Sequence, residues 1–140
     1  MPSPILREKP RQRGRIVGLV LAIAVAAAIF YASSIPGGDL PSHPNVFNVV
    51  AHFLEYALLA GLLAVALNSP DRKLWQTLII AVVIASLYGA SDEVHQHFVP
   101  GRTPDILDWL TDTIGAFVGA SLAVWLIAAR RVRQSRRRDL

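Results

Sequence analysis

Four long apolar runs constrain the fold of this chain more than any other feature of its sequence. They extend from Ile16 to about Ala32, from Val46 to Leu67, from Leu74 to Ala90 and from Ile106 to Ala129. A helix of about 20 apolar residues can cross the hydrocarbon core of a bilayer, where it satisfies its own backbone hydrogen bonds. The mean hydropathy of +0.41 also gives more apolar surface than one small soluble core can bury. The sequence therefore predicts an all-α, integral membrane four-helix bundle.

The ends of the chain differ in character from the apolar runs. Residues 1–15 are basic and contain proline, which predicts a disordered tail, and residues 130–140 form a second basic tail around a membrane domain of residues 16–129. A basic segment before an apolar run also occurs in signal peptides, with cleavage near Ala32-Ser33-Ser34 as the alternative here. The first run is longer than the usual apolar part of a signal peptide, which favours a retained span.

The basic residues indicate how the bundle is oriented. They concentrate in the two tails, and the loop of residues 68–73 adds the adjacent pair Arg72 and Lys73. Because basic residues favour the cytoplasmic side, both termini and this loop are predicted to be cytoplasmic. No aromatic or groove-reading motif accompanies the arginines, so the expected partners are membrane lipids and not nucleic acid. The absence of cysteine excludes disulfides and thiolate chemistry.

A polar segment, Tyr88 to Asp105, separates the third and fourth runs and is predicted to face outward. His95 and His97 within it are expected in a solvated loop. Helical spacing places further polar residues on one face of each of three helices. Ionised groups at membrane depth usually face the bundle interior and pair, so we expect an outward-opening polar funnel between the second, third and fourth helices. Its members are Asn48, His52, Glu55 and Tyr56; Asp92, Glu93 and Gln96; and Asp105, Asp108 and Asp112.

Some of these residues also have a structural interpretation. The segment Thr103-Pro104-Asp105 is a typical helix start, with Thr103 as the predicted N-cap. Arg102 either anchors the chain at the headgroups or binds a phosphate or carboxylate through two hydrogen bonds. His52 is either a hydrogen-bonded core histidine or a functional one. The two glycines whose spacing predicts a close helix-packing face are Gly115 and Gly119.

Three motifs in the chain resemble those of the VanZ-like membrane protein family. The first is His52-Phe53-Leu54-Glu55-Tyr56, the second runs from Asp92 to Arg102, and the third comprises Asp108 and Gly115. They occur in the family's order with similar gaps. The resemblance covers residues 30 to 120, which is most of the predicted membrane domain.

This resemblance implies a multi-pass protein of the bacterial cytoplasmic (inner) membrane. The founding member of the family is associated with low-level resistance to the glycopeptide teicoplanin. Two positions depart from the family: an Asp-Lys pair is common where this chain has Asn48 and Val49, and Asn is common at Asp112. The charge balance of the site is therefore expected to differ from that of other members, and no reaction follows from the resemblance.

The density of acids in one site favours an enzyme that acts on an envelope lipid or a lipid-linked cell-wall intermediate. A divalent metal would suit carboxylates with a histidine, and His52, Glu55 and Asp92 are the candidate ligands. The expected catalytic residues are His52, Glu55, Asp92, Glu93 and Asp112. The expected substrate-binding residues are Tyr56, Gln96, Arg102 and Asp108.

Two other functions stay open at this point. The chain contains no nucleophile elbow, phosphate loop or standard metal signature, which favours a protein that binds or shields a glycopeptide, lipid or partner protein without turnover. A proton- or cation-coupled transporter would use Glu55 and Asp112 as intramembrane titratable groups. Four helices without an inverted repeat disfavour transport, although a dimer would supply the second half.

Overall fold

The protein is a bundle of four long helices. The computed structural model describes residues 4–39 and 45–137, and within these ranges it contains no strand. The helices are α1 (Pro4–Ser33), α2 (Asn45–Leu67), α3 (Leu74–Gln96) and α4 (Ile106–Arg136), and a short 3-10 helix, η1 (Gly37–Asp39), follows α1. Each of the four is long and apolar enough to cross a membrane. The predicted all-α membrane four-helix bundle is confirmed.

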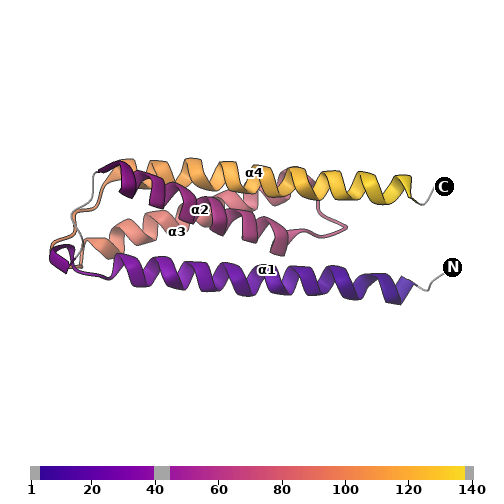
Figure 1. The fold of residues 1–140 in the computed structure, drawn as a ribbon, viewed down its shortest axis with the longest axis horizontal. Coiled ribbons are helices and arrows are strands. Elements are labelled where there is room, and N and C mark those ends of the chain that lie inside the picture. The colour runs from indigo at the N-terminus through magenta and orange to yellow at the C-terminus, as the bar shows by residue number, and fades with distance from the viewer. Residues whose placement is uncertain (1–3, 40–44, 138–140) are drawn as a thin grey trace.

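The helices lie side by side along the longest axis of the molecule, as Figure 1 shows. Both chain ends and the connection between α2 and α3 lie at one end of the bundle, here called the terminal end (Figure 1). The connections that contain residues 34–39 and 97–105 lie at the opposite end, here called the site end (Figure 1). The polar segment between α3 and α4 is thus separated from the termini by the length of the bundle.

The helices continue beyond the apolar runs that predicted them. α1 begins at Pro4, so the described part of the predicted disordered tail, residues 4–15, is helical instead. α3 continues to Gln96 and α4 to Arg136. Once a helix has formed, each further residue adds a backbone hydrogen bond without a new nucleation cost, so helices extend into polar sequence. For α3 this extension keeps the acids after Ala90 on a rigid helix.

Small residues form the contacts between helices, while large apolar side chains face outward. Fully buried positions include Ala60, Ala64, Ala85 and Ala116, whereas Leu87 is 66% exposed. This distribution suits a lipid environment, in which close backbone approach and van der Waals packing hold helices together.

The closest approach of two helices is between α2 and α4. Gly115 lies against the backbone carbonyl of Phe53, and Gly119 lies against that of Ala57, so a Cβ at either glycine would overlap main-chain atoms. The predicted close-packing role of these glycines is confirmed. As a result, the polar faces of α2 and α4 are held directly against each other at the site end.

Candidate functional site

A histidine from α2 and two aspartates from α4 form the centre of the site. His52 Nδ1 lies 2.9 Å from Asp112 Oδ1, and His52 Nε2 lies 4.0 Å from Asp108 Oδ2. An ionised carboxylate can only accept a hydrogen bond, so Nδ1 donates to Asp112, and in the neutral imidazole Nε2 is then the acceptor nitrogen. The Asp112 side chain is fully buried, whereas those of His52 and Asp108 are 16% and 28% exposed. His52 Nε2 therefore lies on the side of the partly exposed Asp108.

Tyr56 and Gly89 complete the floor beneath Asp112. Tyr56 is fully buried, and within the described residues neither its hydroxyl nor Asp112 Oδ2 has a hydrogen-bond partner. A Cβ at Gly89 of α3 would lie 3.0 Å from Asp112 Oδ2 and 3.2 Å from Tyr56 Cε1. Glycine is thus the residue that allows α3 to pack on this floor without displacing Asp112.

Glu55 lies close to the same centre but is held less tightly. It is half-buried, and His52, Asp112 and Asp92 are near enough to act on it electrostatically. Asn48, which was expected on the same face, is exposed on the first turns of α2. The polar face of α2 that reaches the site therefore begins at His52.

Asp92 joins α1 to α3. Its Oδ1 accepts a 2.6 Å hydrogen bond from Ser33 Oγ, and its Oδ2 accepts a 3.0 Å hydrogen bond from Gln96 Nε2. All three side chains are buried. One carboxylate oxygen thus holds the end of α1 and the other is bonded within α3. The catalytic role expected for Asp92 stays a prediction, as does the substrate-binding role expected for Gln96.

Glu93 and Asp105 fix the start of α4. Glu93 Oε2 accepts a 2.7 Å hydrogen bond from the backbone N–H of Asp105, whose own carboxylate accepts one of 2.8 Å from Leu107 N–H. The N-cap of α4 is Asp105 and not Thr103, because the helix begins only at Ile106. The structural interpretation of Asp105 holds, and Glu93 supports it from α3.

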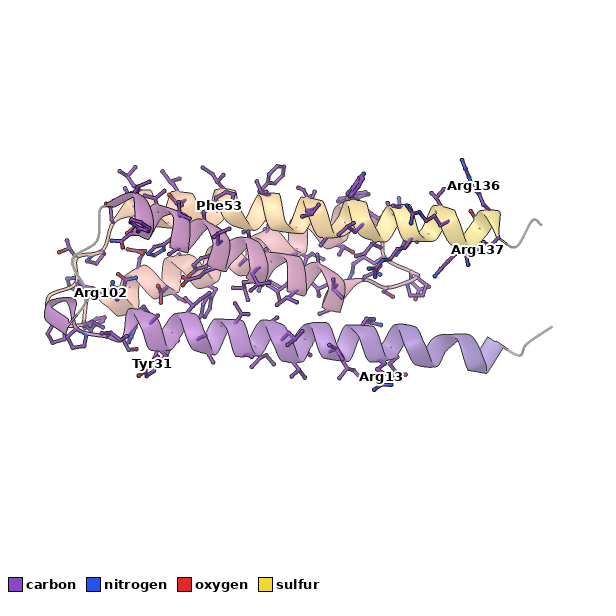
Figure 2. The ribbon with its side chains drawn as sticks, viewed as in Figure 1. Arg13, Tyr31, Phe53, Arg102, Arg136 and Arg137 are labelled. Atoms are coloured by element: carbon purple, nitrogen blue, oxygen red, sulfur yellow. The ribbon has the colours of Figure 1, made fainter. Side chains whose placement is uncertain are left out.

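Arg102 ties the loop at the site end to α1. Its Nε donates to the carbonyl of Ile35 at 3.1 Å, and its terminal nitrogen donates to the carbonyl of Ala32 at 2.9 Å. Figure 2 shows where Arg102 lies at this end of the bundle. Carbonyls at a helix C-terminus carry partial negative charge, which favours a guanidinium there. These contacts give Arg102 a structural role, and its expected substrate-binding role stays a prediction.

The two histidines of the polar segment differ from each other. His95 lies within α3, stacks on Phe30 with ring centroids 4.5 Å apart, and its Nε2 lies 3.0 Å from Ser34 Oγ. It therefore packs against α1, contrary to the expected solvated loop. His97 is exposed just beyond the end of α3.

Within the described residues no group of three or more His, Cys, Asp or Glu side chains is placed to hold a metal ion. The predicted ligands His52, Glu55 and Asp92 are thus not gathered around one point. His52 is hydrogen-bonded to Asp112, and Asp92 is hydrogen-bonded to Ser33. A divalent metal stays a prediction from the residue types alone.

Sequence reasoning missed two residues of the site, Ser33 and Gly89. The funnel was predicted between α2, α3 and α4, whereas Ser33 brings α1 into it through Asp92. Polar residues at the end of an otherwise apolar run were the available signal for Ser33. For Gly89 the signal was a glycine inside an apolar helix, which often marks a close approach.

Comparison with known proteins identifies the family. The family model described as VanZ/LLP1 matches residues 17–128, which include α2, α3 and every residue of the site described above. No curated protein and no solved structure matches the chain. Since the matched residues make up most of the 140-residue sequence, this multi-pass membrane protein belongs to the VanZ/LLP1 family.

Proposed function

We propose that the protein is an enzyme of the bacterial cytoplasmic membrane that acts on an envelope lipid or a lipid-linked cell-wall intermediate, with its site facing outward. The observation that carries this proposal is the pairing of His52 with the fully buried Asp112 at 2.9 Å. An imidazole whose Nδ1–H is held by a carboxylate has one fixed tautomer and one orientation. It is thereby prepared to accept and return a proton at Nε2.

In this proposal His52 is the general base and Asp112 is the positioning residue. His52 Nε2 takes the proton of a water or hydroxyl nucleophile, and the negative charge of Asp112 stabilises the imidazolium that results. The proton then passes from Nε2 to the leaving group. Asp108, 4.0 Å from Nε2 and partly exposed, lies where it would contact the reacting headgroup. General base catalysis of this kind contributes about 10²- to 10⁴-fold in rate.

The membrane setting supports a lipid substrate. The site lies toward one end of four helices that are long enough to cross a membrane, where a lipid headgroup would reach it while its chains stay in the bilayer. The basic residues near the opposite end favour the cytoplasmic side for that end, which would turn the site outward. Low-level teicoplanin resistance, the property associated with the family's founding member, would follow if the lipid-linked target of a glycopeptide were altered or shielded.

Non-catalytic binding is the second candidate, and a specific observation favours it. Three of the predicted functional residues, Asp92, Glu93 and Arg102, make hydrogen bonds that hold the fold together. Fewer groups than expected are thus free for chemistry, and the remaining His52 and Asp108 would suffice to bind a polar headgroup.

The first prediction tests turnover. Envelope lipids and cell-wall precursors are profiled in cells with no protein, the wild type, His52→Gln or Asp112→Asn. The wild type should convert one lipid species, and His52→Gln should reduce that conversion about 10²- to 10⁴-fold, to the level of cells without the protein. Asp112→Asn keeps an acceptor oxygen but loses the charge, so an intermediate reduction is expected.

The matched control is Ser91→Ala, an exposed position on α3 whose hydroxyl bonds only its own helix, and its lipid profile should equal that of the wild type. Identical profiles with and without the wild-type protein would contradict turnover. If the lipid profiles are identical with and without the protein, and the His52→Gln protein no longer retains a lipid that the wild type binds, then the protein binds a lipid without turnover.

A further inference from the structure

A groove separate from the His52–Asp112 pair lies between α3 and the start of α4 at the site end. Its volume is about 260 Å³. Ile106 is 69% exposed and Asp105 is also exposed, so the groove opens to the outside of the bundle. The residues that line it are Ala90, Glu93, Pro104, Asp105, Ile106 and Trp109.

Glu93, one of the residues that line this groove, has a carboxylate oxygen without a partner. Glu93 is only 8% exposed, and its Oε2 is engaged by the N–H of Asp105. Its other oxygen, Oε1, is buried and has no hydrogen-bond partner within the described residues. Burial of an unpaired carboxylate oxygen is unfavourable, so such an atom on a residue that lines a groove favours a donor supplied from outside the chain.

The charges around Glu93 indicate what kind of donor this is. Asp108, His52 and Asp112 all lie near enough to act on it electrostatically, and His52 is hydrogen-bonded to Asp112. Arg102 is directed at the carbonyls of α1. The ligand that fits an acidic, unpaired acceptor is a cation that donates hydrogen bonds.

The start of α4 excludes the opposite charge. A helix N-terminus commonly binds anions through its free N–H groups. Here the N–H groups of Asp105 and Leu107 are already bonded by the carboxylates of Glu93 and Asp105. An anionic headgroup would therefore meet two carboxylates at this point, with the N–H groups of Asp105 and Leu107 already engaged.

We infer that this groove binds a membrane lipid whose headgroup carries a primary ammonium group. The ammonium donates to Glu93 Oε1, and the apolar walls formed by Ala90, Ile106 and Trp109 contact the upper part of the lipid. The bilayer is the source because the groove opens outward between two membrane-crossing helices. The inference rests on the proposed function in one respect, because the lipid bound in this groove would be the class of lipid that is brought beside His52.

The experiment measures which lipid the protein retains. The full-length protein is reconstituted with equal amounts of phosphatidylethanolamine, phosphatidylcholine and phosphatidylglycerol of identical chains, re-extracted, and its bound lipids are counted by native mass spectrometry. The wild type should retain the ethanolamine lipid about tenfold over the glycerol lipid, and Glu93→Gln should remove this preference, because the charge-assisted hydrogen bond is lost.

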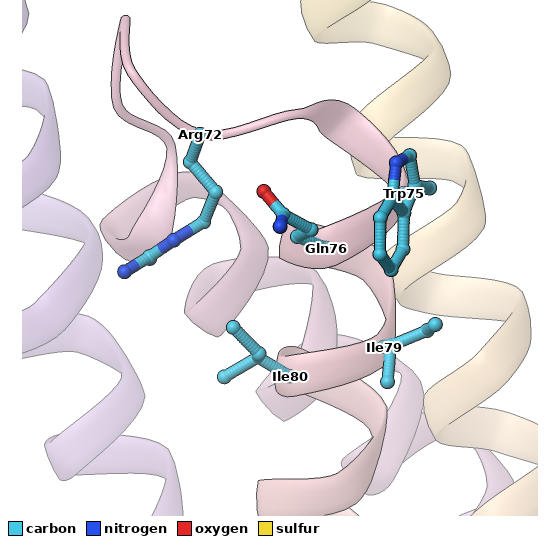
Figure 3. Close-up of a pocket in the computed structure, with 5 residues that line it drawn as sticks. All are labelled: Arg72, Trp75, Gln76, Ile79 and Ile80. Atoms are coloured by element: carbon cyan, nitrogen blue, oxygen red, sulfur yellow. The ribbon is translucent and has the colours of Figure 1, made fainter.

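The matched control uses the groove at the terminal end of the bundle. That groove, of about 300 Å³, is lined by Arg72, Trp75, Gln76, Ile79 and Ile80 (Figure 3). It presents a cation where the first groove presents a carboxylate, so Arg72→Gln should leave the ethanolamine preference unchanged. A second variant, Ala90→Leu, fills the first groove without altering its charge and should lower retention to the same extent as Glu93→Gln.

The inference would be overturned if the wild type retained the glycerol lipid or the choline lipid as well as it retains the ethanolamine lipid. An unchanged preference in a folded Glu93→Gln or Ala90→Leu protein would also overturn it. So would displacement of the lipid by soluble phosphoethanolamine at equal concentration. The His52→Gln protein keeps the groove and should retain the ethanolamine lipid although it lacks turnover. Loss of turnover with retained lipid preference, or the reverse, therefore separates failure of the proposed function from failure of this inference.

Discussion

Buried acids in this protein are stabilised in different ways, and the difference decides what each can do. Both oxygens of Asp92 accept hydrogen bonds from neutral side chains, so this carboxylate is engaged within the fold. Asp112 is paired with a histidine that is itself partly exposed, so its charge acts on a group that solvent can reach. Glu93 has one oxygen engaged and one free. We therefore propose His52 for proton transfer, with Asp112 as its positioning residue, and Glu93 for ligand binding.

The bond between Ser33 and Asp92 should contribute measurably to stability. Ser33→Ala should lower the free energy of unfolding by about 1.5–3 kcal/mol, because a buried 2.6 Å hydrogen bond to a carboxylate is lost. A double-mutant cycle with Asp92→Asn, measured by unfolding in mixed micelles, should give a coupling energy of about 1–3 kcal/mol. Ser91→Ala is the control, since its exposed hydroxyl bonds a carbonyl three residues earlier, and a change within about 0.5 kcal/mol is expected. A coupling energy near zero would show that α1 is not held through this pair.

At the scale of whole helices, α2 and α4 form one unit on which the other two are assembled. The carbonyls of Phe53 and Ala57 lie against the glycines of α4, one turn apart. His52 directly precedes the first of these contacts, and Asp112 lies three residues before Gly115. The spacing of His52 and Asp112 is therefore set by main-chain packing and not by the side chains themselves.

Gly119→Ala should separate these helices. A Cβ there overlaps the Ala57 carbonyl, and backbone atoms cannot move aside as a side chain would. We expect a loss of about 1–3 kcal/mol in the free energy of unfolding, together with reduced turnover as His52 moves away from Asp112. Gly14→Ala is the control, because nothing lies within 4 Å of the added carbon, and a gain of up to about 1 kcal/mol is expected from helix propensity. Equal stability of the two variants would contradict the close-packing account.

The helices could be predicted from the sequence because their signal is local, whereas much of the site could not. Apolar runs identify membrane helices one at a time, and the spacing of Asp108 and Asp112 places both on one face of α4. Which residue each acid contacts depends on how helices approach one another, and that depends on Gly89 and Gly115. The connection of Ser33 to Asp92 spans 59 residues of sequence, and no local pattern contains it. Convergence on His52 was therefore predictable, but the division of roles among the acids was not.

At the scale of the whole molecule, the bundle has two chemically different ends. Acids and a histidine occupy the site end, while the basic residues of the described chain are concentrated toward the terminal end, where Figure 2 shows Arg13, Arg136 and Arg137. A residue pair such as Arg131 and Asn68 connects α4 to the loop between α2 and α3 at that end. This polarity matches the asymmetry of a membrane whose cytoplasmic side attracts lysine and arginine, and it predicts a single orientation.

The absence of cysteine allows this orientation to be measured directly, because each introduced thiol is the only one in the chain. Gly38→Cys lies at the site end, where nothing approaches within 4 Å of an added Cβ, and Asp71→Cys lies in the exposed loop at the terminal end. In intact spheroplasts, a membrane-impermeant maleimide should label Gly38→Cys and leave Asp71→Cys unlabelled until the membrane is permeabilised. Arg136→Cys, on the same end as Asp71, should behave as Asp71→Cys does. The reverse pattern would place the site in the cytoplasm, and the substrate would then be an intermediate of the inner leaflet.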